Sequence, residues 1–278
     1  MKKITRRSFL AAAGLTAAAL ALTACGGSSS GTASSTASSA AASSEAASSS
    51  AAELTTVEAG KLTMATNAAF PPYEMTTDTG AFEGIDVDTA QAIAEKLGLE
   101  LQIDDMDFDA ALLSVQQGKA DIVMAGVTVT DERKAVMDFS DSYATGIQSI
   151  IVPEGSDIAT PDDLAGKKIG TQRGTTGYIY CSDDFGDENV VAYDDGLTAV
   201  QALNNGQVDA VVIDNAPAKE FVAANPGLVI LDTSYAEEDY AIGMAKGSAL
   251  EDAINATLEE LKADGTLQSI VDKYITAE

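Results

Sequence analysis

The sequence contains no histidine and no tryptophan, and it has only two cysteines among its 278 residues. Without histidine the chain cannot form a Ser-His-Asp triad, a Cys-His pair or the commonest zinc sites. Cys25 lies near the N-terminus, and Cys181 has no histidine that could activate its thiol. These absences argue against nucleophilic catalysis and against a structural or catalytic zinc. We therefore expect no cofactor, no metal and no enzymatic activity.

Basic residues are also scarce, because 16 lysines and arginines stand against 43 aspartates and glutamates. Four of the basic residues lie among the first 24, and without them 12 remain, so the net charge is near −31. A surface of this charge repels phosphate backbones and anionic headgroups. Nucleic acid is therefore excluded as a partner.

The N-terminus has the pattern of an export signal. Four basic residues precede an apolar stretch, residues 9–22, which is shorter than the roughly 20 residues that span a bilayer. Residues 1–24 are therefore expected to be a signal peptide and no part of the fold. Residues 22–25, Leu-Thr-Ala-Cys, resemble the bacterial lipobox, which implies a palmitate-bearing anchor on Cys25. The pair Arg6 and Arg7 fits a twin-arginine signal or a general secretory signal equally well.

A low-complexity segment follows the expected anchor. Apart from Glu45, residues 26–52 are all Gly, Ser, Thr or Ala, which cannot bury enough apolar surface to fold. Such a chain behaves as a flexible tether with a reach of roughly 30 Å. We expect residues 25–56 to space a folded domain from the outer face of the cell membrane.

The remaining chain alternates short β-rich runs with helical patterns, which predicts an α/β fold. Strands are expected at 62–65, 99–103, 121–124, 168–170 and 210–213. Asp88 fits the N-cap of a helix over 88–97, and Gly98 fits its end. Near the C-terminus, residues 248–251 fit a capping box, Gly265 ends the helix that follows, and a last helix covers 267–275.

One pattern occurs twice, 88 residues apart. Residues 108–123 and 196–211 each give a helix, a glycine (Gly118 or Gly206), an aspartate (Asp121 or Asp209) and an apolar strand in the same register. Two similar α/β lobes would produce this repeat, and so would a coincidence between two common helix–strand units.

Three segments could together bind a small amphoteric ligand. Thr128 and Arg133 follow a buried strand and offer donors to a carboxylate, although an arginine at such a position is often a solvated helix charge. The turn 174–177, Gly-Thr-Thr-Gly, offers amides and hydroxyls to an anion, or is a plain helix start. Asp214 ends an apolar strand, where open α/β sheets bind ligands, or caps the next segment.

A series of short motifs covers nearly all of residues 57–276. The strongest are ATNAAFPPYE at 65–74, GIDVD at 84–88, DFD at 107–109 and AGVTVTDER at 125–133. DFSD at 138–141, GTTG at 174–177, DAVVID at 209–214 and KADGT at 262–266 continue the series in order. Together these motifs resemble those of the family 3 solute-binding proteins, which serve polar amino-acid transporters of the ATP-binding-cassette type.

The resemblance implies a type II periplasmic-binding fold, an L-amino-acid ligand and a membrane permease as partner. Lobe 1 would comprise 57–143 plus 239–278, and lobe 2 would comprise 150–232, with hinges near 144–149 and 233–238; we expect a monomer. Arg133 would bind the ligand carboxylate, aided by Thr128, Thr175 and Thr176. Asp214 and the Gly126 carbonyl would take the ammonium, and Phe70 and Phe108 would enclose the side chain, with Tyr143 beside it.

Asn67 departs from relatives that place a carboxylate there for a basic ligand. An amide carries no charge, so Asn67 and Gln172 leave room for a glutamine-like neutral ligand as well as a basic one. Two rivals use the same fold or location. An exported dehydratase would need a carboxylate such as Asp214 or Glu74 for acid–base work, and a sensor domain would need a signalling segment after residue 275.

Overall fold

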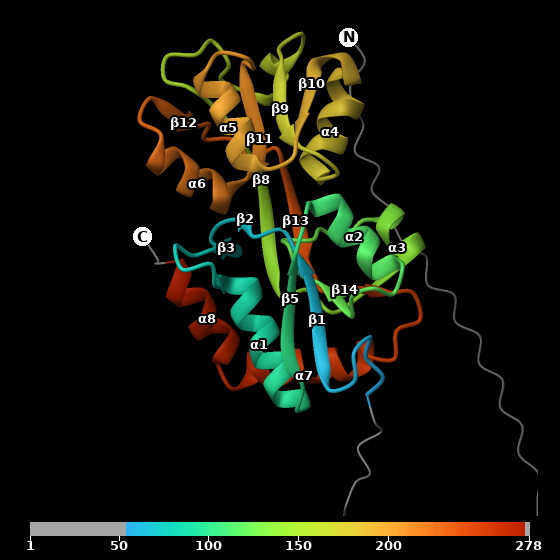
Figure 1. Cartoon of the computed structure of the whole chain (residues 1–278). Coiled ribbons are helices and arrows are strands. Elements are labelled where there is room, and N and C mark those ends of the chain that lie inside the picture. Colours follow the sequence, from blue (N-terminus) through green and yellow to red (C-terminus); the bar gives the residue numbers. More distant parts are fainter. Residues whose placement is uncertain (1–53, 276–278) are drawn as a thin grey trace, which may run out of the picture. The chain divides into compact units, whose positions relative to one another are not determined.

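The computed structural model describes residues 54–275. The predicted signal peptide, Cys25 and the tether over 26–52 lie outside the described residues, so these predictions are untested. Within 54–275, no helix is both long and apolar enough to cross a membrane. The described chain forms two α/β lobes, each built around its own sheet (Figure 1).

The sheet of lobe 1 has five strands in the order β5-β1-β6-β14-β7. β1 pairs in parallel with β5 and β6, whereas β14 runs antiparallel to β6 and β7. Their bounds are β1 Lys61–Thr66, β5 Glu100–Asp105, β6 Ile122–Val123, β7 Met137–Phe139 and β14 Gly243–Ala245. A small antiparallel sheet, β2 Ala69–Phe70, β3 Glu74–Thr76 and β4 Phe82–Glu83, joins the same lobe.

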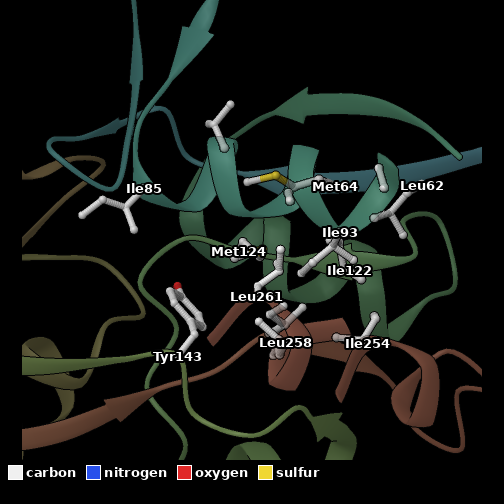
Figure 2. Close-up of a cluster of buried hydrophobic side chains, with 14 of the residues drawn as sticks. Leu62, Met64, Ile85, Ile93, Ile122, Met124, Tyr143, Ile254, Leu258 and Leu261 are labelled. Atoms are coloured by element: carbon white, nitrogen blue, oxygen red, sulfur yellow. The ribbon is translucent and has the colours of Figure 1, made fainter. Parts of the chain in front are cut away.

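The helices of lobe 1 come from both ends of the described chain. They are α1 Ile85–Leu97, α2 Phe108–Gln116, α3 Asp131–Val136, α7 Glu251–Ala263 and α8 Thr266–Tyr274. Figure 2 shows the core that α1 and α7 share with β1: Leu62 and Met64 of β1 and Ile93 of α1 lie close to Leu258 and Leu261 of α7. The C-terminal helices therefore complete the lobe that the N-terminal strand begins.

Lobe 2 is built on strands in the order β10-β9-β11-β8-β12, with β13 added to β8. Three helices and two short 3-10 turns cover it. The bounds are β8 Ala144–Pro153, β9 Ile169–Gln172, β10 Val190–Tyr193, β11 Ala210–Asp214, β12 Leu228–Ile230, β13 Ala236–Tyr240, α4 Thr176–Phe185, α5 Gly196–Asn204, α6 Asn215–Ala224, η1 Pro161–Leu164 and η2 Asp187–Asn189.

Two antiparallel strands connect the lobes. The chain leaves lobe 1 through β8 and returns through β13, and the register pairs Tyr240 with Ala144 and Ala236 with Gln148 (Figure 1). Two α/β lobes joined by two strands are what the sequence predicts. The residue at which each lobe begins and ends stays a proposal, with the predicted bounds of 57–143 plus 239–278 and of 150–232.

The repeat found in the sequence is a structural repeat. α2 and α5 span nine residues each, begin after Asp107 and Asp195, and are followed by Gly118 and Gly206 with φ of 65° and 67°. Each unit leads into a buried strand, β6 in lobe 1 and β11 in lobe 2. The matched register therefore reflects equivalent helix–strand units in the two lobes.

Two predicted helix caps are wrong. α1 begins at Ile85 after Gly84, whose φ of 135° and close approach to the Tyr73 carbonyl suit only glycine. Asp88 therefore lies inside the first turn, where its carboxylate accepts from Lys273 Nζ at 2.7 Å and from the Tyr274 hydroxyl at 2.9 Å of α8.

The predicted capping box at 248–251 does not form, because α7 begins at Glu251 after Leu250, without a side-chain cap. Ser248 Oγ instead accepts the N–H of Leu250 at 3.2 Å. The predicted end of α1 is confirmed, since Gly98 is left-handed and its N–H bonds to the Ala94 and Glu95 carbonyls.

Candidate functional site

A cavity lies between the two lobes, and the space inside it, including the part that opens to solvent, is about 450 Å³. Ten of the eleven predicted ligand-binding residues line it: Asn67, Phe70, Phe108, Gly126, Thr128, Arg133, Gln172, Thr175, Thr176 and Asp214. The other lining residues are Glu74, Ala125, Gln148, Val212, Ile213 and Tyr240.

Arg133 is a buried cation in the cavity wall, with 9% of its surface exposed. It belongs to α3, which starts where the Thr130 hydroxyl accepts the Arg133 N–H. Its Nη1 donates to the Thr128 carbonyl at 2.8 Å and its Nη2 to the Gly174 carbonyl of lobe 2 at 3.1 Å. A guanidinium has five N–H groups, so three have no partner among residues 54–275 and can bind an anion.

Arg133 carries a buried positive charge that no carboxylate of the described residues pairs with directly. Burial lowers the pKa of the guanidinium, and the nearby carboxylate of Glu238 acts in the opposite direction. The group also lies 5.5 Å from the centre of the Phe108 ring, a cation–π distance. No carboxylate of the described chain forms an ion pair with it within 4 Å, and an anionic ligand would therefore complete its environment.

The start of α4 faces the same cavity with backbone donors. The Thr175 hydroxyl caps this helix: it accepts the N–H of Tyr178 at 3.3 Å and donates to the Gln172 carbonyl at 2.8 Å. The N–H groups of the first helical turn have no intrahelical acceptors, and the helix dipole makes this end positive. Thr175 therefore shapes the helix start, and its hydroxyl proton is already engaged.

Asp214 caps α6, as one interpretation of the sequence predicted, and it also lines the cavity. Its carboxylate accepts the N–H of Ala216 at 3.2 Å at the start of α6 and the N–H of Ile147 at 2.7 Å in β8. Burial raises the pKa of Asp214 to about 6, although the Tyr240 hydroxyl and these N–H groups oppose the shift. A cation beside this carboxylate would favour its charged form.

The opposite wall contains a carboxyl that the sequence argument assigned only to a rival enzymatic role. Glu74 is fully buried, and neither of its oxygens accepts an N–H or hydroxyl donor of the described residues. Desolvation first, and then the charge of Asp86, raise its pKa well above the ordinary value, and the two carboxyls share a hydrogen bond. Glu74 therefore has a partner while it is protonated, whereas an ionised Glu74 would need a donor from a ligand. Across the described residues, no three acidic or thiol groups are placed to hold a metal ion.

Asp86 lies behind this wall and supports it. One oxygen accepts the N–H of Gly126 at 3.0 Å, and the other accepts the Tyr143 hydroxyl at 2.7 Å. Burial raises the pKa of Asp86 to about 6, against the effect of these two donors. Tyr143 therefore does not border the cavity as predicted, because its hydroxyl points to Asp86 and its ring lies in the core of lobe 1.

Gly126 must be glycine at its position in the cavity wall. Its φ is 55°, and an added Cβ would lie 2.9 Å from the Phe70 ring and 3.2 Å from the Tyr240 ring. A larger residue would push Phe70 into the cavity. Because glycine has no side chain, a ligand in the cavity can also reach the backbone of residue 126.

Asn67 and Gln172 join the lobes directly. Gln172 Nε2 donates to Asn67 Oδ1 at 2.8 Å, and Asn67 Nδ2 donates to the Met106 carbonyl at 3.0 Å. Their amides therefore bind each other in this closed arrangement as well as facing the cavity. Arg173 is absent from the lining: its side chain is 53% exposed and lies 3.5 Å from Asp194.

Sequence reasoning missed three polar groups at the site, namely Gln148 of β8, Glu238 of β13 and the cavity-lining role of Glu74. The first two lie on the connecting strands, where alternation of polar and apolar residues gives no sign of a cleft. Glu74 was inside a quoted motif, and its place directly after two prolines and an aromatic residue was the available signal. Its burial could be known only from the packing of β3 against α1.

These features define a class of protein: two α/β lobes on two connecting strands, with a closed cavity that offers a buried arginine, a helix start and several carboxyls to a small ligand. The chain belongs to the bacterial extracellular solute-binding proteins, family 3, whose model matches residues 62–277. Members of this family are solute-binding proteins.

Known proteins of this kind resemble the chain over most of its length. The L-cystine-binding protein TcyJ of Escherichia coli (strain K12) is 33% identical over 226 residues, which cover 80% of this chain and 85% of that protein. Two solved structures of an ancestral arginine-binding protein cover 78% of this chain. The complex with arginine is 42% identical to this chain, has a TM-score of 0.74 and is covered over 98% of its length. The complex with glutamine is 41% identical, has a TM-score of 0.75 and is covered over 99% of its length.

Proposed function

We propose that this protein is the extracytoplasmic binding component of an amino-acid importer, and that it binds a polar L-amino acid, with L-arginine preferred to L-glutamine. The observation that carries the preference is the fully buried carboxyl of Glu74 in the cavity wall, which has no cationic partner among the described residues. The class of ligand is supported by the family, and the arginine preference by the relatives whose names or structures include arginine.

The main-chain groups of the ligand would bind near Arg133. Its three free N–H groups and the positive start of α4 suit a carboxylate, which forms strong charge-assisted hydrogen bonds with a guanidinium. Asp214 and the Gly126 carbonyl would take the ammonium, because the buried aspartate lacks a cationic partner among the described residues.

The side chain of the ligand would lie between Phe70 and Phe108, both of which line the cavity. A guanidinium that passes these rings would reach Glu74, with the charge of Asp86 behind it. The resulting ion pair would be buried and hydrogen-bonded, the condition under which a desolvated charge pair is favourable. This placement gives every unpaired polar group of the cavity a partner.

L-Glutamine is the second candidate, because Asn67 and Gln172 are uncharged amides that suit a carboxamide. It would leave the Glu74 carboxyl protonated and paired with a neutral group. Discrimination between the two amino acids therefore depends on whether Glu74 becomes charged when the ligand binds.

Binding would proceed by closure of the two lobes around the connecting strands. Contacts between the lobes, such as Arg133 with the Gly174 carbonyl, exist only when the lobes meet. A ligand that touches both lobes adds contacts to the closed form and shifts the equilibrium toward it. The closed protein would then present itself to a membrane permease and release the amino acid unchanged, without catalysis.

The expected lipid anchor on Cys25 would keep the protein at the outer face of the cell membrane. The tether of roughly 30 Å would hold the binding lobes close to the permease and raise their local concentration. Metabolic labelling with palmitate, compared between the wild type and Cys25→Ser, tests this part separately from ligand binding.

The function is tested with the full chain carrying Cys25→Ser, unfolded and refolded to remove any bound ligand. A thermal-shift screen of the twenty amino acids should single out L-arginine, because a ligand at 1,000 times its Kd adds about 4 kcal/mol of stability. If no amino acid raises the melting temperature, the proposed function is wrong. If glutamine alone raises it, the class is right and the preference is wrong.

A further inference from the structure

Glu238 is a buried carboxyl on the connecting strand β13 that contacts both lobes. It is 7% exposed and does not line the cavity. Its Oε2 accepts the hydroxyl of Thr128 from lobe 1 and the hydroxyl of Thr176 from lobe 2, both at 3.0 Å. Gln148 Nε2, from the other connecting strand, donates to the same oxygen at 3.0 Å. One oxygen atom of β13 thus contacts the segment of Thr128, helix α4 and strand β8.

These contacts decide where the hydroxyl protons point. A threonine hydroxyl has one proton and two lone pairs. Thr128 and Thr176 both line the cavity, and the single proton of each is engaged with Glu238 or with the other hydroxyl 3.4 Å away. Their oxygens can therefore only accept hydrogen bonds on the cavity side. This holds whether or not the other oxygen of Glu238 carries a proton, since Oε2 remains an acceptor.

We infer that Glu238 is a positioning residue that turns the Thr128 and Thr176 hydroxyls into acceptors and so reserves this part of the cavity for the ligand's ammonium. Three groups then surround the ammonium position: Asp214, Thr128 and Thr176. The carboxylate is left to Arg133 and to the backbone N–H groups of α4. The inference rests on the proposed function, because it assumes an amino-acid ligand.

Direct geometry supports the assignment. The Thr128 and Thr176 hydroxyl oxygens are 3.4 Å apart, so a single ammonium group can reach both. The charge of Glu238 shifts the pKa values of its neighbours. It opposes the lowering of the Arg133 pKa by burial, and it adds to desolvation, the larger cause, in raising the pKa of Tyr180 to about 12.

The test compares L-arginine with 5-guanidinopentanoic acid, which lacks only the ammonium, by calorimetric titration of the ligand-stripped chain. Glu238→Met removes the acceptor at similar size and should weaken L-arginine about tenfold, while the affinity for 5-guanidinopentanoic acid changes less than twofold. Glu238→Gln keeps an acceptor oxygen and should retain L-arginine affinity within about threefold. Glu237→Gln, an exposed residue on the same strand, is the matched control and should change neither ligand.

A second measurement avoids any folding defect of Glu238→Met. Thr128→Val combined with Thr176→Val in the presence of native Glu238 should also weaken L-arginine and spare 5-guanidinopentanoic acid, and adding Glu238→Met should then change L-arginine affinity by less than twofold. Equal losses for both ligands, or a loss in Glu238→Gln as large as in Glu238→Met, would overturn the inference. If the wild-type chain binds no amino acid, the proposed function fails instead.

Discussion

The two walls of the cavity treat charge in opposite ways. On one wall, Arg133 is buried, yet two of its N–H groups are held by carbonyls of both lobes. On the other, Glu74 is buried without a cationic partner among the described residues, and its carboxyl shares a hydrogen bond with that of Asp86. Burial is the largest cause of the pKa shift at both groups; besides it, Glu238 and two tyrosines act on Arg133, whereas Asp86 and Asp105 act on Glu74. Different charges therefore act on the two walls.

This difference indicates which part of the ligand each wall selects. We call the side that contains Arg133 the arginine wall and the side that contains Glu74 the glutamate wall. The arginine wall is pre-organised and stays charged without a ligand, so it suits the carboxylate that every amino acid carries. The glutamate wall is incomplete without a ligand, so it suits the group that distinguishes one amino acid from another. Affinity should depend on the first wall and specificity on the second.

The largest effect is expected from Arg133→Ala. It removes the charge-assisted hydrogen bonds to any amino-acid carboxylate, each worth about 1.5–3 kcal/mol, so every ligand should weaken by roughly a hundredfold or more. Calorimetric titration with L-arginine and L-glutamine checks this. Arg173→Ala, an exposed arginine paired with Asp194, is the control and should leave both affinities unchanged.

The melting temperature of the ligand-free variant separates a binding role from a structural one. The Arg133 guanidinium donates only to carbonyl oxygens of the protein and lies over the Phe108 ring, so Arg133→Ala should change this temperature by a few degrees at most. A collapse of the ligand-free fold would show that the arginine wall is structural and would contradict the comparison.

Glu74→Gln should separate the two amino acids. A carboxamide of the same shape cannot form the proposed ion pair, so L-arginine should weaken by about 2 kcal/mol, roughly thirtyfold, while L-glutamine changes little. Glu83→Gln, on the neighbouring strand β4 and exposed, is the matched control. An equal loss for both amino acids would assign Glu74 to the fold instead of to specificity.

Acidification should move stability and affinity in opposite directions. The pKa values of Asp214 and Asp86 are raised to about 6 in the fold, so the folded form binds more protons than the unfolded form between pH 4 and 6. The ligand-free protein should therefore be more stable at pH 5 than at pH 7.5, by about 2 kcal/mol or roughly 4–8 °C. L-Arginine should bind less tightly at pH 5, because a protonated Asp214 no longer attracts an ammonium.

Thermal melts and titrations at both pH values check this prediction. Asp214→Asn should reduce the gain in stability on acidification, since it removes one of the two titrating groups. An affinity for L-arginine that does not change between pH 7.5 and pH 5 would remove Asp214 from the ammonium site.

The sequence predicted most of the α/β order and ten of the cavity residues, because these depend on local signals. The Thr130 cap, the glycines after the helices and the strand-end position of Asp214 are all visible in a few adjacent residues. Glu238 could not be predicted from such signals. Its role depends on the antiparallel register of β8 and β13, which brings residues far apart in the chain to one oxygen atom.

The caps failed for a related reason. Asp88 has the right spacing for an N-cap, but it is held by Lys273 and Tyr274, which lie at the other end of the described chain. Long-range partners overrode a local preference in this helix. Asn67 is also held by a residue far away in the sequence, because its partner across the cleft is Gln172.

The smallest effect is expected from Asn67→Asp, which adds charge near the glutamate wall. The new carboxylate can still accept from Gln172, but it cannot donate to the Met106 carbonyl, so the ligand-free fold should lose about 1 kcal/mol. The extra negative charge should raise the ratio of L-arginine to L-glutamine affinity by about threefold to fivefold, measured by titration of both ligands. Asn204→Asp, an exposed asparagine of α5 that bonds Asn225, controls for the general addition of charge. If the ratio falls instead, the side chain of the ligand does not approach Asn67, and specificity must be assigned to Glu74 alone.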